Sequence, residues 1–86
     1  MSSLEPFPLI SAQLRAARAL VGWTAEDLAK NAGVGVSTVR RAEAAEGALG
    51  INAANETVIR GALERAGVIF VPENGEGPGV RLRKER

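Results

Sequence analysis

The chain has 86 residues, a length that suits one small domain, and it contains neither Cys nor His. This composition excludes disulfides, zinc sites built from Cys or His, and catalysis by a histidine base. The net charge is +1 at pH 7, which is too small to indicate a nucleic-acid partner by itself. We therefore expect no metal, no cofactor and no enzyme activity. The distribution of residues along the chain indicates more about function than the net charge does.

Residues 1–9 carry Pro6 and Pro8, which disfavour a helix and predict an extended leader. This segment has no basic start followed by a long apolar stretch, so it does not resemble a secretory signal. No apolar run in the chain approaches the roughly 18 residues that a membrane-spanning helix needs. The expected location is the cytoplasm, with no membrane partner.

A first helix is predicted from Ile10 to about Val21, with Ser11 as its N-terminal cap. Gly22 can end this helix because glycine adopts a positive φ angle without steric cost. One side of the helix is apolar at helical spacing, through Ile10, Leu14, Ala17 and Val21.

Thr24 predicts the start of a second helix. Its hydroxyl can accept a hydrogen bond from the amide of Asp27, and the Asp27 carboxylate can reach back to the amide of Thr24. The helix ends at Gly33, and only residues 33–35 separate it from a third helix, predicted from about Val36 to Ala44. Two short helices joined by so tight a turn predict a helix-turn-helix.

The third helix has two different sides when its residues are placed at intervals of about 100°. Val39, Ala42 and Glu43 lie on the side that faces the body of the protein. The opposite side carries small, polar and basic residues: Val36, Ser37, Arg40, Arg41 and Ala44.

That outer side suits the major groove of DNA. Arg41 can donate two hydrogen bonds to guanine, and Ser37 can bond to several base edges. Val36 can contact a thymine methyl group, and Arg40 can reach a base or a phosphate. Thr38 lies at the flank, where its hydroxyl can meet a phosphate.

A fourth helix is predicted to begin at Asn52 or Asn55, either of which can cap it. Gly67 ends it, and its buried face is expected to comprise Val58, Ile59, Ala62, Leu63 and Ala66.

The last part of the chain predicts a β-hairpin. Residues 68–71 are β-branched or aromatic, and residues 80–83 alternate apolar and charged, with Val80 and Leu82 expected to point inward. Either residues 68–71 pair with the same strand of a second copy, or the hairpin only covers the base of the first and fourth helices. The sequence thus predicts a mainly α fold of four helices followed by a C-terminal hairpin, with a leader (1–9), a helix-turn-helix domain (10–66) and a hairpin with a basic tail (67–86).

The segment TAEDLAKNAGVGVSTVRRAE, residues 24–43, resembles the Cro/CI-type (XRE-type, lambda-repressor-like) helix-turn-helix family of transcriptional regulators. The resemblance covers about residues 10–66. The segment LERAGVIFVPENGEGPGVRLR is similar to the ending of a compact bacterial subgroup of these regulators. The family implies a domain that binds a palindromic operator in double-stranded DNA as a homodimer.

The resemblance also assigns roles to residues. It implies that the backbone amides of Thr24, Ala25 and Glu26 face a phosphate and that Val36, Ser37 and Arg41 read bases. It further implies a salt bridge between Arg18 and Glu43.

The sequence departs from the family pattern at three places. Ala25 stands where the family often has a phosphate-binding Gln, and Gly35 stands where a Ser often caps the third helix. A hairpin is predicted where the family usually has a fifth helix.

The sequence leaves two interpretations open beside an enzyme, which is disfavoured. The first is a sequence-specific regulator, most simply a repressor that occupies a promoter. The second is a protein-interaction module on the same scaffold, such as an anti-activator or an antitoxin-like protein, which Ala25 and the low net charge would suit.

Overall fold

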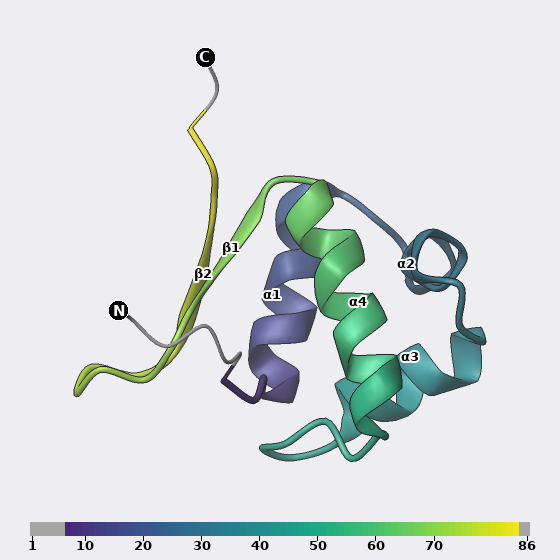
Figure 1. Ribbon diagram of the computed structural model, residues 1–86, viewed down its shortest axis with the longest axis horizontal. Coiled ribbons are helices and arrows are strands. Elements are labelled where there is room, and N and C mark those ends of the chain that lie inside the picture. The colour runs from purple at the N-terminus through teal and green to yellow at the C-terminus, as the bar shows by residue number, and fades with distance from the viewer. Residues whose placement is uncertain (1–6, 85–86) are drawn as a thin grey trace.

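The computed structural model describes residues 7–84, so Pro6 and Arg86 of the expected leader and tail lie outside the described residues. The elements are α1 (Ser11–Val21), α2 (Ala25–Ala32), α3 (Val36–Ala44), α4 (Ala53–Arg65), β1 (Val68–Val71) and β2 (Gly79–Leu82). The two strands form an antiparallel sheet (Figure 1). The predicted fold class, four helices and a C-terminal hairpin, is confirmed.

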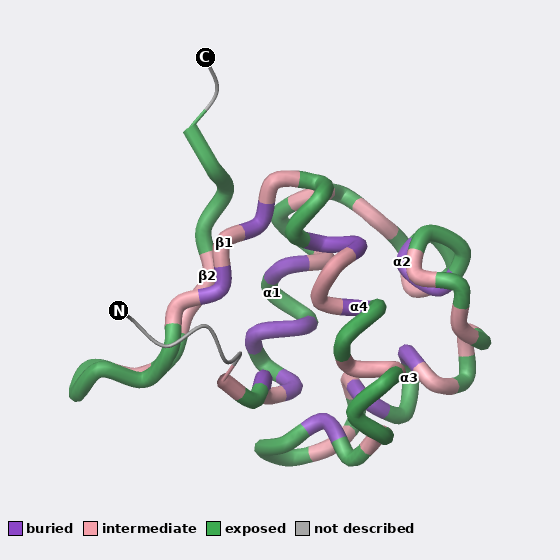
Figure 2. The backbone as a smooth tube through the Cα atoms, in the orientation of Figure 1, coloured by how far each residue is buried: buried purple, intermediate pink, exposed green. Residues whose placement is uncertain are grey.

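The core lies where α1 and α4 stand side by side between the hairpin and the α2–α3 pair (Figure 1). Buried stretches of the backbone face this centre in each helix and in β1 (Figure 2). The buried apolar residues are Leu9, Leu14, Ala17, Leu28, Ala29, Val39, Ala42, Leu49, Ile59, Ala62, Leu63, Val68 and Phe70. Burial of these side chains is the main stabilising contribution to the fold.

The start of α1 differs from the prediction. Ile10 occupies the cap position, and the side chain of Gln13 accepts a hydrogen bond from the amide of Ile10 at 3.1 Å. Ser11, which was expected to cap the helix, is buried instead, and its hydroxyl donates to the carbonyl of Ala42 at 2.5 Å. The cap prediction was wrong because the hydroxyl has a partner in α3 that the local sequence does not reveal.

Gln13 also connects α1 to the hairpin. Its buried amide nitrogen donates to the carbonyl oxygens of Val71 at 3.1 Å and Gly79 at 3.0 Å. One side chain therefore caps α1 and holds both strands at the end of the hairpin nearest the turn.

The buried face of α4 is narrower than predicted. Ile59, Ala62 and Leu63 are buried, whereas Val58 is 41% exposed and Ala66 lies in the exposed turn after the helix. Val58 precedes Ile59 by one residue, and this turns its side chain about 100° away from the core.

Leu82 was expected to point inward but is 45% exposed. It lies across the hairpin from Val68, so both side chains share one face of the sheet. Val68 belongs to the strand that packs on α4 and takes the buried position, which leaves Leu82 at the outer strand.

Residues 7–9 are fixed along α4. The guanidinium of Arg60 lies 5.1 Å from the ring centre of Phe7 and 5.9 Å from that of Phe70. It also donates to the carbonyl of Phe7, while the Glu56 carboxylate accepts from the amide of Leu9 at 2.9 Å. This segment therefore belongs to the packed body of the protein.

Candidate nucleic-acid interface

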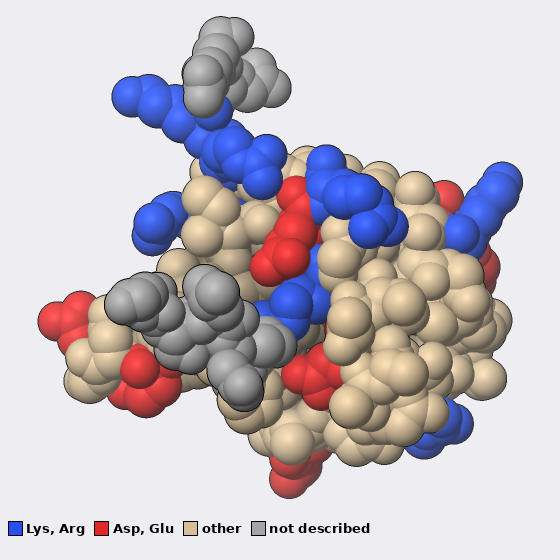
Figure 3. All heavy atoms as spheres, viewed as in Figure 1, with Lys and Arg blue, Asp and Glu red and all other residues tan. Residues whose placement is uncertain are grey.

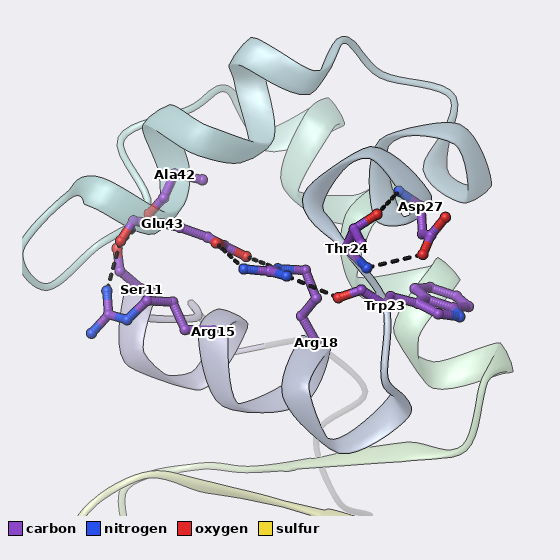
Figure 4. Close-up of polar contacts among 8 residues, drawn as sticks. All are labelled: Ser11, Arg15, Arg18, Trp23, Thr24, Asp27, Ala42 and Glu43. Atoms are coloured by element: carbon purple, nitrogen blue, oxygen red, sulfur yellow. Dashed lines mark hydrogen bonds and ion pairs between the residues drawn. The ribbon is translucent and has the colours of Figure 1, made fainter.

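The beginning of α2 has the reciprocal cap expected from its sequence (Figure 4). The Thr24 hydroxyl accepts from the amide of Asp27 at 3.0 Å, and the Asp27 carboxylate accepts from the amide of Thr24 at 3.0 Å. The hydrogen bond from the Thr24 amide lowers the pKa of Asp27 below its usual value. The ionised Asp27 carboxylate therefore stabilises the folded protein at neutral pH, and this stabilisation is lost as the pH falls through the lowered pKa.

The turn between α2 and α3 is set by Gly33. Its φ angle is 76°, in the left-handed region that glycine adopts readily. The amides of Gly33 and Val34 both donate to the carbonyl of Ala29, at 2.8 and 3.0 Å. Val34 also packs against the core, which holds the two helices at a fixed angle.

The outer side of α3 is open to solvent. Ser37, Arg40, Arg41 and Ala44 are exposed, while Val39 and Ala42 anchor the opposite side in the core. The two remaining candidates on this helix, Val36 and Thr38, are half-buried, and Val36 packs against the core. Only part of the Val36 side chain is thus available to a partner.

The N-terminal turn of α2 presents exposed Thr24 and Glu26, and half-buried Ala25. Ala25 packs against the core, as an apolar residue does at that position. A positive helix end attracts anions. Here the amide of Thr24 donates to the Asp27 carboxylate and that of Glu26 to its own carboxylate, so these two amides are already bonded to anionic groups of the protein. The structure places the three residues expected at phosphate on one helix end, beside the outer side of α3.

Glu26 and Arg40 form an ion pair between α2 and α3. Both side chains are more than half exposed, so water screens the attraction. The pKa of Glu26 is lowered, first by a hydrogen bond from its own backbone amide and then by the charge of Arg40. Arg40, expected to reach a base or a phosphate, therefore has a carboxylate partner within the protein. Among residues 7–84, Arg41 takes part in no ion pair.

Behind the outer face, the structure brings Arg18 and Glu43 together in a two-pronged ion pair (Figure 4). The Arg18 Nε donates to one carboxylate oxygen at 2.7 Å and Nη2 to the other at 2.9 Å. The remaining guanidinium nitrogen donates to the carbonyl of Trp23 at 2.8 Å. Glu43 raises the pKa of Arg18, chiefly through the hydrogen bonds between its carboxylate and the guanidinium. A single side chain therefore joins α1, the start of α2 and the end of α3.

Two contacts at the same place were not anticipated from the sequence. Arg15 donates to the carbonyl of Glu43 at 2.6 Å, and Ser11 donates to that of Ala42. Both satisfy carbonyl groups at the C-terminal end of α3, where no further helical turn is present to do so. The i, i+4 spacing of Ser11 and Arg15 is the one signal in the sequence that puts them on the same side of α1.

The described residues contain no cluster of acidic side chains that could hold a metal ion. Within residues 7–84, none of the helices combines the length and apolar character needed to cross a membrane.

A comparison with curated proteins finds no match to this chain. A comparison with protein families finds one over residues 14–54, to the model described as helix-turn-helix. The matched segment runs from α1 through α3 to the beginning of α4, and includes the capped start of α2, the Gly33 turn and the outer side of α3. By this match and this geometry, the segment from α1 to the beginning of α4 carries a helix-turn-helix that is similar to that of the Cro/CI-type (XRE-type) DNA-binding regulators.

Proposed function

We propose that the protein is a repressor that binds a palindromic operator as a homodimer and inserts α3 into the major groove. The observation that carries the proposal is the exposed outer side of α3, on which Arg41 has no ion-pair partner within the described residues. An arginine in this position can donate two hydrogen bonds to a guanine.

The roles of the individual residues belong to the same proposal. Arg41 and Ser37 read bases, and the exposed part of Val36 contacts a thymine methyl group. Thr38 and the amide of Ala25 meet phosphates. The amides of Thr24 and Glu26, which the resemblance also assigns to phosphate, already donate to carboxylates of the protein. Arg18 and Glu43 hold α3 in position, and residues 10–66 form the DNA-binding domain.

Selection of random duplex DNA by the purified protein tests this proposal. We expect enrichment of a palindrome whose half-sites lie one helical turn or a multiple of it apart, about 34 Å per turn. Binding of the enriched DNA should weaken steeply as salt rises, since phosphate contacts release counterions. Failure of the folded protein to enrich any sequence would contradict the proposal.

The pair between Glu26 and Arg40 favours one other function, a protein-interaction module. Glu26 puts a negative charge at the end of α2 that would face phosphate, and it neutralises Arg40, one of the two arginines on α3. A folded protein that retains no DNA but captures another regulator at a fixed stoichiometry would support this second candidate.

Glu26→Gln is expected to strengthen non-specific DNA binding. The substitution removes a negative charge near the DNA and releases Arg40, so the slope of log K against log[salt] should steepen by about one unit. Arg40→Ala in the unchanged background should alter the slope much less, because Glu26 already holds Arg40. Fluorescence anisotropy with random duplex DNA at several salt concentrations measures both effects.

Glu46→Gln, a change of the same charge in an exposed loop, is the control. An equal change of slope in both Glu→Gln variants would contradict the prediction.

A further inference from the structure

The beginning of α1 holds the end of α3. α3 has nine residues, about two and a half turns, and the carbonyl groups of its last turn have no partner within the helix. The Ser11 hydroxyl donates to the carbonyl of Ala42 at 2.5 Å, and the Arg15 guanidinium donates to that of Glu43 at 2.6 Å (Figure 4). Because so short a helix depends on tertiary contacts, both bonds help to set its orientation.

The two bonds differ in their access to water. Ser11 is 1% exposed and Ala42 is fully buried, so the bond between them lies inside the protein. Arg15 is exposed, and water can take the place of its guanidinium at the carbonyl of Glu43. A buried carbonyl that loses its donor keeps the cost of desolvation without a bond in return. The Ser11 hydroxyl is therefore the contact that α3 cannot replace with water.

The backbone of the same segment holds the loop that follows α3. The amide of Ser11 donates to the carbonyl of Gly47 at 2.7 Å, and Ile10 forms an antiparallel β-bridge with Ala48. Ser11 is thus bonded through its side chain to the last turn of α3 and through its backbone to the loop beyond. One residue of α1 therefore contacts both the end of α3 and the chain that leaves it.

The exposed side chains of α3 depend on how this end is held. Arg41 precedes Ala42 by one residue, and Ser37 lies in the first turn of the helix. Val39 anchors the middle of α3 in the core. Without the bond at Ala42, α3 can tilt about Val39, and such a tilt moves the side chains at its two ends in opposite directions.

We propose that Ser11 is a positioning residue for base recognition: its buried hydroxyl fixes the angle of α3 and, with it, the direction in which Ser37 and Arg41 enter the major groove. This inference rests on the proposed function and adds to it a residue that does not itself touch DNA. Hydrogen bonds span only about 0.5 Å in donor–acceptor distance, so a small tilt of α3 weakens contacts with bases. Attraction to phosphates depends on charge and is much less sensitive to the tilt.

Ser11→Ala is expected to reduce base preference and to leave general attraction to DNA in place. The ratio of the affinity for the selected operator to that for random duplex DNA should fall about tenfold, comparable with the loss of one base contact. Ser11 carries no charge, and the substitution retains the Lys, Arg, Asp and Glu side chains that stand at the surface in Figure 3. The slope of log K against log[salt] for random DNA should therefore not change. Fluorescence anisotropy with both DNAs measures the ratio and the slope.

Gln13→Ala is the matched control. Gln13 lies two residues further along α1 and is also buried, but its side chain bonds to the hairpin and to the amide of Ile10, not to α3. Its loss should destabilise the fold, which urea unfolding measures, and should leave the ratio of affinities unchanged. A ratio that stays the same in Ser11→Ala, or that falls equally in both variants, would overturn the proposal.

A distance measurement without DNA tests the same role. The chain has no Cys, so Ala44→Cys on α3 and Glu64→Cys on α4, both at exposed positions, provide two sites for spin labels. Ser11→Ala should shift or broaden the distribution of distances between the labels, measured by double electron–electron resonance, and Gln13→Ala should leave it unchanged.

The two measurements separate this inference from the proposed function. An unchanged distance distribution in Ser11→Ala would overturn the role of Ser11 even in a protein that binds no DNA. Failure of the unchanged protein to select an operator would instead overturn the proposed function, and the spin labels would still decide whether Ser11 holds α3 at its angle.

Discussion

Arg18→Ala is expected to lower the free energy of unfolding by about 2–4 kcal/mol, about 1 kcal/mol less than is usual when a fully buried ion pair is broken. The pair is only partly buried, with 27% of the Arg18 side chain and 11% of the Glu43 side chain exposed, so water offsets part of the loss. The substitution leaves the Glu43 carboxylate without its two donors and the carbonyl of Trp23 without its arginine. Urea unfolding followed by circular dichroism measures the effect.

Arg15→Ala is the matched control, because it removes an arginine from the same helix. Arg15 is exposed and donates to one backbone carbonyl, so its loss should cost less than about 1 kcal/mol. Arg18→Lys keeps the charge but cannot bond to both carboxylate oxygens, and its cost should lie between the two. An unfolding free energy that is the same for Arg18→Ala and Arg15→Ala would show that the ion pair does not hold the helices together.

Local signals predicted the starts of α2 and α4 and the ends of α1 and α2, because these boundaries depend on neighbouring residues. Thr24 caps α2 through Asp27, three residues along the chain, and Asn52 caps α4 through the amide of Asn55 in the same way. Gly22 and Gly33 take the positive φ angles that end α1 and α2. Short-range hydrogen bonds of this kind can be inferred from the sequence alone.

The positions that were missed depend on partners far along the chain. Ser11 bonds to α3 instead of capping α1, and Gln13 bonds to strands that lie more than 50 residues away. The alternation of apolar and charged residues predicts that Leu82 points inward. In the structure Val68, which lies opposite Leu82 on β1, occupies the buried position. A periodic pattern shows which face of an element is apolar, but it does not show how wide the core beneath that face is.

The candidate site could be predicted in part for the same reason. The separation of α3 into an anchored side and an exposed side follows from its helical period, and Val39, Ala42, Ser37 and Arg41 lie as that period requires. The partner of Arg40 does not follow from it, because Glu26 lies on another helix and meets Arg40 only when the Gly33 turn fixes the angle between them.

Arg41→Ala is expected to cost about 1–3 kcal/mol of specific binding to the selected operator and to relax the preference at one base pair of each half-site. The reason is that Arg41 is exposed on α3 and has no carboxylate partner among residues 7–84, so its donors remain available to a base. Competition between the operator and single-base variants of it, measured by fluorescence anisotropy, gives both the loss and the position.

Arg41→Lys separates base reading from simple attraction to phosphate. Lysine keeps the positive charge, so the salt dependence should stay close to that of the unchanged protein, but it lacks the planar pair of donors that matches guanine. We therefore expect Arg41→Lys to lose most of the base preference while retaining non-specific affinity. Arg65→Ala removes an exposed arginine near the end of α4 and should leave the base preference unchanged. If Arg41→Lys and Arg41→Ala both keep the full preference and differ only in their salt dependence, then Arg41 contacts a phosphate, and base reading must come from the remaining outer side chains of α3.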